Sequence, residues 1–312
     1  MKVPVSRVLL LFRWCFALSL ILCTNVCTVC GSDTAVSESF DYPPGAQPPV
    51  YGGGTGWSGD SRKGSWKVGS KEKIPEPNII AEGSLIFGDA QGRKFPATGN
   101  KALNGESVRV ELSRRIEPET GALAKLTLPA TTSSEQNIER SVAGVGAADG
   151  TIWFSAVVLP GPSSLTLRLS NFAYKAAPSG VSFKFDIPNN QLVCGQDWYH
   201  LKKANVRQSI DLPVPVTQPI SLVAQLTFGN DWGTSKEFAD FYATKKTAVI
   251  PEATGRLLVW LNPPLDKEPT PDSAQIDIPM LEFRFNTLEL NLDPGASVDE
   301  LRLGLSFDDV NH

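Results

Sequence analysis

The chain has 312 residues, of which 41% are hydrophobic and 20% are charged, and its formal net charge is −4. These values are those of an ordinary globular protein with one large domain or two small ones. Because nucleic-acid-binding domains normally carry a basic face, the acidic balance argues against a nucleic acid as partner.

Residues 1–31 have the pattern of a secretory signal peptide. A basic N-terminal stretch leads into the apolar run 14–22, and no acid occurs before Asp33. The run is shorter than the roughly 20 residues that a membrane-spanning helix needs. We expect cleavage after Gly31, no membrane span after that cleavage, and a secreted or extracytoplasmic protein, with the cell surface as one location open to it.

Cysteines are concentrated in the same segment. Removing residues 1–31 removes four of the five cysteines and leaves Cys194, so no internal disulfide is expected. We expect Cys194 to be a small buried side chain rather than a reactive thiol. Cys23, Cys27 and Cys30 keep a lipidated N-terminus open as the alternative, although the residues before each of them fit a lipobox poorly.

The rest of the chain divides into a short linker, 32–38, and one domain, 39–312. Glycine, proline and serine crowd residues 43–70, which predicts an irregular but ordered loop near the start of the domain. Helix candidates are few and short, and they are residues 133–141 and 235–245.

Alternation of apolar and polar residues dominates the domain. It is clearest in the segments 108–112, 165–169, 181–187, 281–285 and 301–307. Such alternation is typical of antiparallel strands with one face in a core. Three further runs are apolar on both faces and are predicted to be central strands, 152–159, 222–228 and 257–261. The predicted fold class is therefore all-β, an antiparallel two-sheet sandwich whose first and last strands meet.

Four short stretches of the domain have distinctive motifs: Phe-Asp-Tyr and Gly-Gly-Thr-Gly within 40–59, Gly-Thr-x-Trp at 150–153, Val-Trp-Leu-Asn-Pro at 259–263 and Asp-Glu-Leu-Arg-Leu-Gly at 299–304. In these stretches the chain resembles the concanavalin A-like lectin/glucanase superfamily, in a form found in extracytoplasmic bacterial proteins. Laminin-G-like domains end on a similar strand. The resemblance implies a concanavalin A-like jelly roll over most of 39–310. It leaves function open, because this fold carries lectins, glycanases, adhesion modules and structural domains.

The sequence lacks the catalytic pattern of this superfamily's glycanases, which place acids as Glu-x-Asp-x-x-Glu or Glu-x-Asp-x-Glu on one strand. No Glu-x-Asp occurs, and the acidic pair nearest in shape, Asp266 and Glu268, lies in a proline-rich loop. His200 is the sole credible base for a nucleophilic triad, and a lone histidine is more often structural. We therefore expect no catalytic residues and no enzymatic activity.

No cofactor is expected, because the mature chain lacks the histidine and cysteine ligands that zinc needs. Calcium is the alternative, since loop carboxylates are its usual ligands. The possible donors are Asp231, Asp266, Asp299, Asp308 and Asp309, none of them in a loop with ligand spacing. Asp299 and Arg302 are instead expected to anchor the last strand through hydrogen bonds or an ion pair.

Aromatic residues in loop-like contexts are the candidate ligand-binding residues, because the apolar face of a sugar stacks on such rings. The candidates are Trp232, Trp57, Trp198 and Tyr199, with Trp232 favoured for its Gly-Asn-Asp-Trp-Gly context. Trp153 and Trp260 lie in strand-like runs and are expected in the core.

These observations predict a secreted, non-catalytic binding module with carbohydrate as the favoured ligand. A structural or adhesion domain of the cell surface, with no small ligand, is the alternative. A glycan-active enzyme is the less favoured third class. The expected partner is a glycan or a cell-surface polymer, and the oligomeric state is left open.

Overall fold

The computed structural model describes thirteen segments of the domain. They are 35–44, 53–57, 65–69, 79–97, 99–117, 121–128, 143–147, 149–171, 180–197, 205–212, 216–229, 252–281 and 284–311. The chain separates into two units, Met1–Ser32 and Asp33–His312, and every described residue lies in the second. The predicted signal peptide and the helix candidates 133–141 and 235–245 lie outside the described residues.

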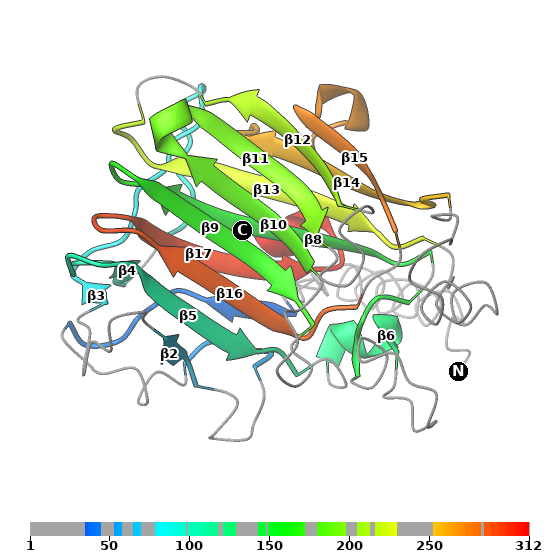
Figure 1. The fold of residues 1–312 in the computed structure, drawn as a ribbon, viewed down its shortest axis with the longest axis horizontal. Coiled ribbons are helices and arrows are strands. Elements are labelled where there is room, and N and C mark those ends of the chain that lie inside the picture. The colour runs from blue at the N-terminus through cyan, green and yellow to red at the C-terminus, as the bar shows by residue number, and fades with distance from the viewer. Residues whose placement is uncertain are drawn as a thin grey trace, which may run out of the picture. The chain divides into compact units, whose positions relative to one another are not determined.

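The described strands form two large sheets (Figure 1). The eight-stranded sheet has the order β15 (Ile276–Met280), β14 (Gly255–Leu261), β13 (Ile220–Thr227), β8 (Thr151–Leu159), β17 (Ser297–Gly304), β4 (Lys101–Leu103) and β3 (Ile80–Ala81), with β1 (Val36–Glu38) also paired to β17. The seven-stranded sheet has the order β12 (Val206–Asp211), β11 (Gln191–Asp197), β10 (Gly180–Asp186), β9 (Ser164–Ser170), β16 (Thr287–Leu292), β5 (Val110–Arg115) and β2 (Lys67–Gly69).

Smaller elements complete the described part of the domain. A two-stranded sheet pairs β6 (Thr127–Leu128) with β7 (Gly144–Val145). The short helices are η3 (Gly121–Leu126), η5 (Ile187–Asn189), η8 (Pro271–Ser273) and α3 (Phe307–Asn311). All strand pairs are antiparallel, and the predicted two-sheet jelly-roll sandwich is confirmed.

The main core lies between the two sheets, as the alternation predicts. On β10, Phe183 and Phe185 are fully buried while Lys184 between them lies on the opposite face. Phe183 stacks on Phe154 of the other sheet, with 5.5 Å between ring centroids. Cys194 is 0% exposed in the same core, and burial raises the pKa of its thiol. It is therefore a buried apolar side chain, as predicted.

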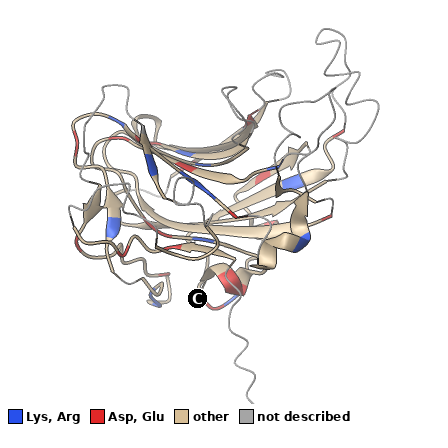
Figure 2. Ribbon diagram, turned by 90° about the horizontal axis from the view of Figure 1, so that it is seen from below, with Lys and Arg blue, Asp and Glu red and all other residues tan. Residues whose placement is uncertain are grey.

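The outer face of the eight-stranded sheet is also covered, which explains why its central strands are apolar on both faces. Trp153 on β8 stacks on Trp260 on β14 at 5.6 Å, and Phe307 of α3 meets Trp153 edge-on at 5.5 Å. Leu85 and Phe87 belong to a second cluster, which covers β8 at Val157. Figure 2 shows the C-terminal helix on the side of this sheet that faces away from the seven-stranded sheet.

The last predicted strand is too long. Alternation predicts a strand over 301–307, but β17 ends at Gly304 and Phe307 begins α3. The carboxylate of Asp309 accepts the backbone N–H groups of Leu305 and Ser306, both at 2.9 Å, and so holds the chain in a turn. Of the predicted strand 281–285, residues 282–283 lie outside the described residues, and Phe285 forms an isolated bridge with Val145.

The first and last strands meet, as predicted. Val36, Ser37 and Glu38 of β1 pair with Leu303, Arg302 and Leu301 of β17. Residues 36–38 of the predicted linker 32–38 thus form a strand of the eight-stranded sheet. Glu38 is buried there in a charge pair, described below.

Candidate functional site on the polar face of the seven-stranded sheet

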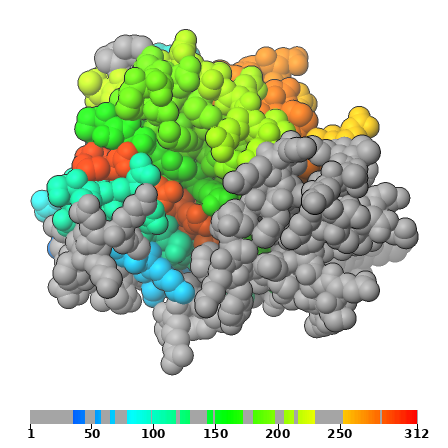
Figure 3. All heavy atoms as spheres, in the orientation of Figure 1, coloured from blue at the N-terminus to red at the C-terminus, as the bar shows by residue number. Residues whose placement is uncertain are grey.

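One face of the seven-stranded sheet is buried. The opposite face carries polar side chains, and we call it the polar face. Because side chains alternate along each strand, the observed register arranges them in rows across the sheet. One row reads, from β2 to β12, Lys67, Ser113, Glu289, Arg168, Ser182, Gly195 and Arg207. This sheet faces the reader in Figure 1, and Figure 3 shows the same side of the molecule as spheres.

A hollow of about 280 Å³ lies on this face over β9 to β12. Its cations are Arg168, Lys184 and Arg207, and its one carboxylate is Asp197. Thr166, Ser182 and Asn291 add hydroxyl and amide groups to the wall. The described residues of the hollow therefore offer hydrogen-bond donors from four strands, β16, β9, β10 and β12, which only the register of the sheet brings together.

Each cation has a carboxylate neighbour. Lys184 Nζ lies 2.9 Å from Asp186, and Arg207 lies 2.7 Å from Asp197. The contact of Arg168 with Glu289 is longer, at 3.6 Å, and Glu289 also accepts the hydroxyl of Ser170. The hydrogen bond from Lys184, followed by one from Asn189, lowers the pKa of Asp186. Each cation of the hollow is thus paired with a carboxylate on the same face.

Two glycines keep the floor of the sheet open beneath the charged side chains. A Cβ on Gly195 would lie 2.3 Å from the carbonyl oxygen of Val206 and 2.7 Å from Cγ of Arg207. A Cβ on Gly180 would lie 2.4 Å from the carbonyl oxygen of Leu169 and 3.1 Å from Nε of Arg168. These distances leave no room for a Cβ at either position. Because both residues are glycines, the side chains of Arg207 and Arg168 can lie close to the backbone of the neighbouring strand.

A second hollow, of about 370 Å³, lies beside Trp260. The ring is only 2% exposed, and its N–H donates to Thr270 O and Ser273 Oγ at 3.3 and 3.2 Å. Pro263, Pro264 and other loop residues supply much of the wall. This hollow has fewer charged side chains than the first, so the polar face is the better candidate site.

The sequence-predicted aromatic residues are not gathered at this site within the described part of the chain. Trp232, Trp198 and Tyr199 lie outside the described residues, although Trp198 directly follows Asp197, which lines the hollow. Trp57 is described and is 9% exposed. Its N–H donates to Ser37 O at 2.9 Å, and the guanidinium of Arg114 covers its ring at 4.3 Å from the centroid.

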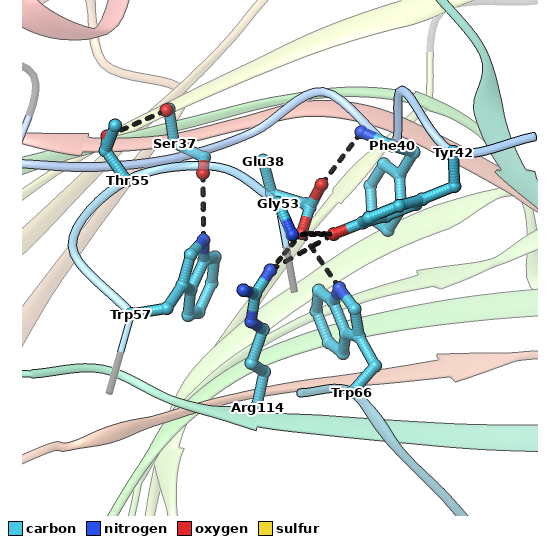
Figure 4. Close-up of polar contacts among 9 residues, drawn as sticks. All are labelled: Ser37, Glu38, Phe40, Tyr42, Gly53, Thr55, Trp57, Trp66 and Arg114. Atoms are coloured by element: carbon cyan, nitrogen blue, oxygen red, sulfur yellow. Dashed lines mark hydrogen bonds and ion pairs between the residues drawn. The ribbon is translucent and has the colours of Figure 1, made fainter. Parts of the chain in front are cut away.

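Trp57 belongs to a buried polar cluster that the sequence did not predict (Figure 4). Glu38 lies at its centre and accepts hydrogen bonds from Phe40 N, Tyr42 Oη and Trp66 Nε1 at 2.8–2.9 Å. Arg114 reaches the same carboxylate from the other sheet. Both side chains of this pair are 1% exposed, so the cluster offers no surface to a ligand.

Burial controls the ionisation of this cluster. It raises the pKa of Glu38, against the opposing effects of Arg114 and of the hydrogen bonds from Trp66 and Tyr42. Burial, reinforced by the charge of Glu38, also raises the pKa of Tyr42. We infer a structural role, because the opening loop, the first strand and β5 all contribute to one buried network.

Asp299 and Arg302 hold β17 to the segment that follows β3. Asp299 accepts backbone N–H groups from Leu85 and Glu300, both at 2.9 Å. Arg302 contacts Glu300 at 2.8 Å and donates to Pro96 O at 3.2 Å. Asp299 and Arg302 thus form no ion pair with each other in these contacts, and both contact Glu300. Burial raises the pKa of Asp299 to about 8, with a further contribution from the nearby charge of Glu300.

The carboxylates considered for calcium are dispersed. Asp266 pairs with Arg93, and Asp309 caps the turn after β17. Within the described segments, no group of three or more His, Cys, Asp or Glu side chains is arranged to hold a metal ion. Asp231 lies outside those segments, so the calcium alternative stays a prediction. None of the helices among the described residues is long and apolar enough to cross a membrane.

Comparison with known proteins gives matches only among solved structures. No family model matches the chain, and no curated protein matches it. A carbohydrate-binding module from Bacillus subtilis is 8% identical and covers 73% of this chain and 96% of its own, with a TM-score of 0.33. A legume lectin-like domain from Entamoeba histolytica is 6% identical over 77% of this chain and 90% of its own, with a TM-score of 0.35.

A glycoside hydrolase family protein from Mycobacterium thermorestibile is 13% identical over 86% of this chain and 99% of its own, again with a TM-score of 0.35. Likenesses this distant carry no information about function. The fold therefore rests on the strand order of the two antiparallel sheets, which form a two-sheet sandwich.

Proposed function

We propose that the protein is a secreted, non-catalytic carbohydrate-binding module and that it binds its ligand on the polar face of the seven-stranded sheet. One observation carries the proposal: a row of charged and hydroxyl side chains crosses the sheet over a glycine-floored hollow of about 280 Å³. Sugar hydroxyls both donate and accept hydrogen bonds. Paired arginines and carboxylates offer both kinds of partner in fixed positions.

The charge pairs suit this role because they are preorganised. Arg168, between Ser182 and Glu289 in the row, is only 19% exposed, and the paired Glu289 is 18% exposed. Side chains held in this way lose little conformational freedom when a ligand binds, so a larger part of the interaction energy remains as affinity. Absence of catalysis is part of the proposal. Among the described residues that line the hollow, Asp197 is the one carboxylate, whereas glycoside hydrolysis uses a pair of carboxyl groups.

The first test is a glycan-array screen of the protein, run with calcium and again with EDTA. We expect selective binding that Arg168→Gln reduces and that Arg256→Gln leaves unchanged. Arg256 is a matched control because it forms a 2.8 Å ion pair with Asp277, with both side chains about half exposed, on the eight-stranded sheet. Loss of binding in EDTA would show that binding needs calcium, with loop carboxylates as the ligands of the ion.

Two further measurements separate the alternatives. Trp232→Ala, Trp198→Ala and Tyr199→Ala in the same screen test whether these rings add stacking contacts to the site. Incubation of each bound glycan with the protein, followed by an assay for new reducing ends, tests the absence of catalysis. Folded protein that binds no glycan under either condition would favour a structural or adhesion domain instead.

A further inference from the structure

We infer that the hollow on the polar face takes an acidic glycan, a sugar chain that carries carboxylate or sulfate groups. This inference rests on the proposed function and narrows its ligand class. Its basis is the relative exposure of the paired charges. Lys184 is 45% exposed while Asp186 is 17% exposed, and Arg207 is 61% exposed while Asp197 is 27% exposed. A ligand that approaches the sheet therefore meets the cations first.

The balance of charge in the wall points the same way. Three cations and one carboxylate line the hollow, in a chain whose formal net charge is −4. The two carboxylates that would balance the cations, Asp186 and Glu289, lie beside their partners and are each less than one-fifth exposed. The cations and their paired carboxylates are equal in number, but Lys184 and Arg207 are the more exposed members of their pairs, so an anion at the hollow can lie closer to the cations than to the carboxylates.

The spacing of the cations fits a chain with repeated charges better than a single small anion. Arg168 and Arg207 lie in the same row on strands β9 and β12, which are three strand spacings apart. At about 4.8 Å per spacing, their backbones are separated by about 14 Å. Lys184 lies on β10, a strand between β9 and β12, and it belongs to the row next to that of Arg168 and Arg207. A polymer with charges at intervals can engage all three cations.

The exposed cations have the donors to bind such groups. A lysine ammonium carries three N–H donors and an arginine guanidinium carries five. One bond from Lys184 goes to Asp186, and one from Nη2 of Arg207 goes to Asp197. Charge-assisted hydrogen bonds to carboxylate or sulfate oxygens are stronger than bonds to neutral hydroxyls. The described residues that line the hollow include no aromatic ring, so charge is the main interaction that they supply.

The test measures binding to two pairs of matched polymers by affinity electrophoresis or calorimetry. The first pair is polygalacturonate and its methyl ester, and the second is dextran sulfate and dextran. We expect binding to the charged member of at least one pair and at least about tenfold weaker binding to its neutral counterpart, because one charge-assisted hydrogen bond is worth 1.5 kcal/mol or more. The pair that shows the preference identifies carboxylate or sulfate as the group.

Variants place the interaction in the hollow. Lys184→Gln and Arg207→Gln are each expected to weaken binding of the preferred polymer about tenfold, whereas Arg256→Gln leaves it unchanged. The control removes the same charge from a similarly exposed ion pair on the other sheet. Circular dichroism and melting curves check that each variant is folded. Equal losses in all three variants would mean unspecific charge attraction and would overturn the inference.

The remaining outcomes separate the inference from the proposed function. Selective binding of neutral glycans that Arg168→Gln abolishes would overturn the acidic ligand and leave the carbohydrate-binding module standing. No binding of any glycan or charged polymer by the folded protein would overturn both.

Discussion

Glu38 on β1 and Arg114 on β5 form an ion pair that joins the two sheets inside the sandwich. Each side chain is 1% exposed, so solvent contributes almost nothing to their stabilisation. The carboxylate is satisfied instead by Arg114, Trp66, Tyr42 and the backbone of Phe40 (Figure 4). Two charges that are taken out of water in this way depend on each other, and removing one leaves the other without compensation.

Arg114→Met is therefore expected to lower the free energy of unfolding by about 3–5 kcal/mol. The measurement is urea unfolding followed by tryptophan fluorescence. Arg256→Gln breaks a half-exposed pair with Asp277 and should cost at most about 1 kcal/mol. The double variant Glu38→Gln with Arg114→Met should lose less than the sum of the single losses. Additive losses would show that the two charges are not coupled.

Gly195 is expected to tolerate no side chain. Gly195→Ala places a Cβ 2.3 Å from a backbone oxygen of β12, which cannot rotate away. We expect a loss of about 1–3 kcal/mol in stability, as for other overpacked sites, together with weaker glycan binding because Arg207 must move. Gly88→Ala is the control, since its Cβ would come no closer than 3.6 Å to its nearest neighbour, the carbonyl oxygen of Arg93. Equal melting temperatures for the two variants would contradict the expected clash.

Asp299 makes stability depend on pH. Its folded pKa of about 8 lies above the value of about 3.9 expected in the unfolded chain. Between these values the folded state holds the proton that the unfolded state has released, so this contribution to stability is complete below pH 4 and falls as pH rises toward 8. Asp299→Asn does not titrate. Its unfolding free energy should fall less than that of the wild type between pH 5 and pH 8, and parallel curves would refute this assignment.

Phe307 is expected to protect the tryptophan pair on the outer face of the eight-stranded sheet. The centroid of its ring lies 5.5 Å from the ring centroid of Trp153, which stacks on Trp260. Phe307→Ala should cost about 3–5 kcal/mol and shift tryptophan emission to longer wavelength as the pair gains solvent. Ile86→Ala is the control, because Ile86 is 63% exposed and its removal should change stability by at most about 0.5 kcal/mol. Unchanged emission in Phe307→Ala would mean that α3 does not shield the pair.

Strands were predictable where the pattern is local. The alternation of Val181, Phe183 and Phe185 with polar neighbours identifies β10, because burial of one face is a property of the strand itself. The turn after Gly304 was not predictable, because it depends on a side chain five residues further along, Asp309. The burial of Glu38 is a related case, because its buried partner, Arg114, is 76 residues away.

The candidate site was harder to predict than the fold. Arg168, Lys184 and Arg207 occupy ordinary polar positions of three separate strands, and only the register places them around one hollow. The sequence does show that Arg168 and Lys184 stand at polar positions of alternating strands. It does not show that the two strands are neighbours, which follows from the register. Trp57 was proposed as a sugar platform because its loop is rich in glycine. The positive φ angles of Gly54 and Gly56 instead let the loop turn inward and bury the ring.

Pairing of β1 with β17 has a consequence for how the chain matures. Val36 pairs with Leu303, and the side chain of Asp299 on β17 accepts the backbone N–H of Leu85, 214 residues earlier, so the eight-stranded sheet cannot be completed until β17 has been synthesised. Until then β8, which is apolar on both faces, lacks its neighbour β17 and presents an open edge. Such edges recruit strands from other molecules. Contacts so distant in sequence form slowly, so we expect this edge to stay open until late in folding.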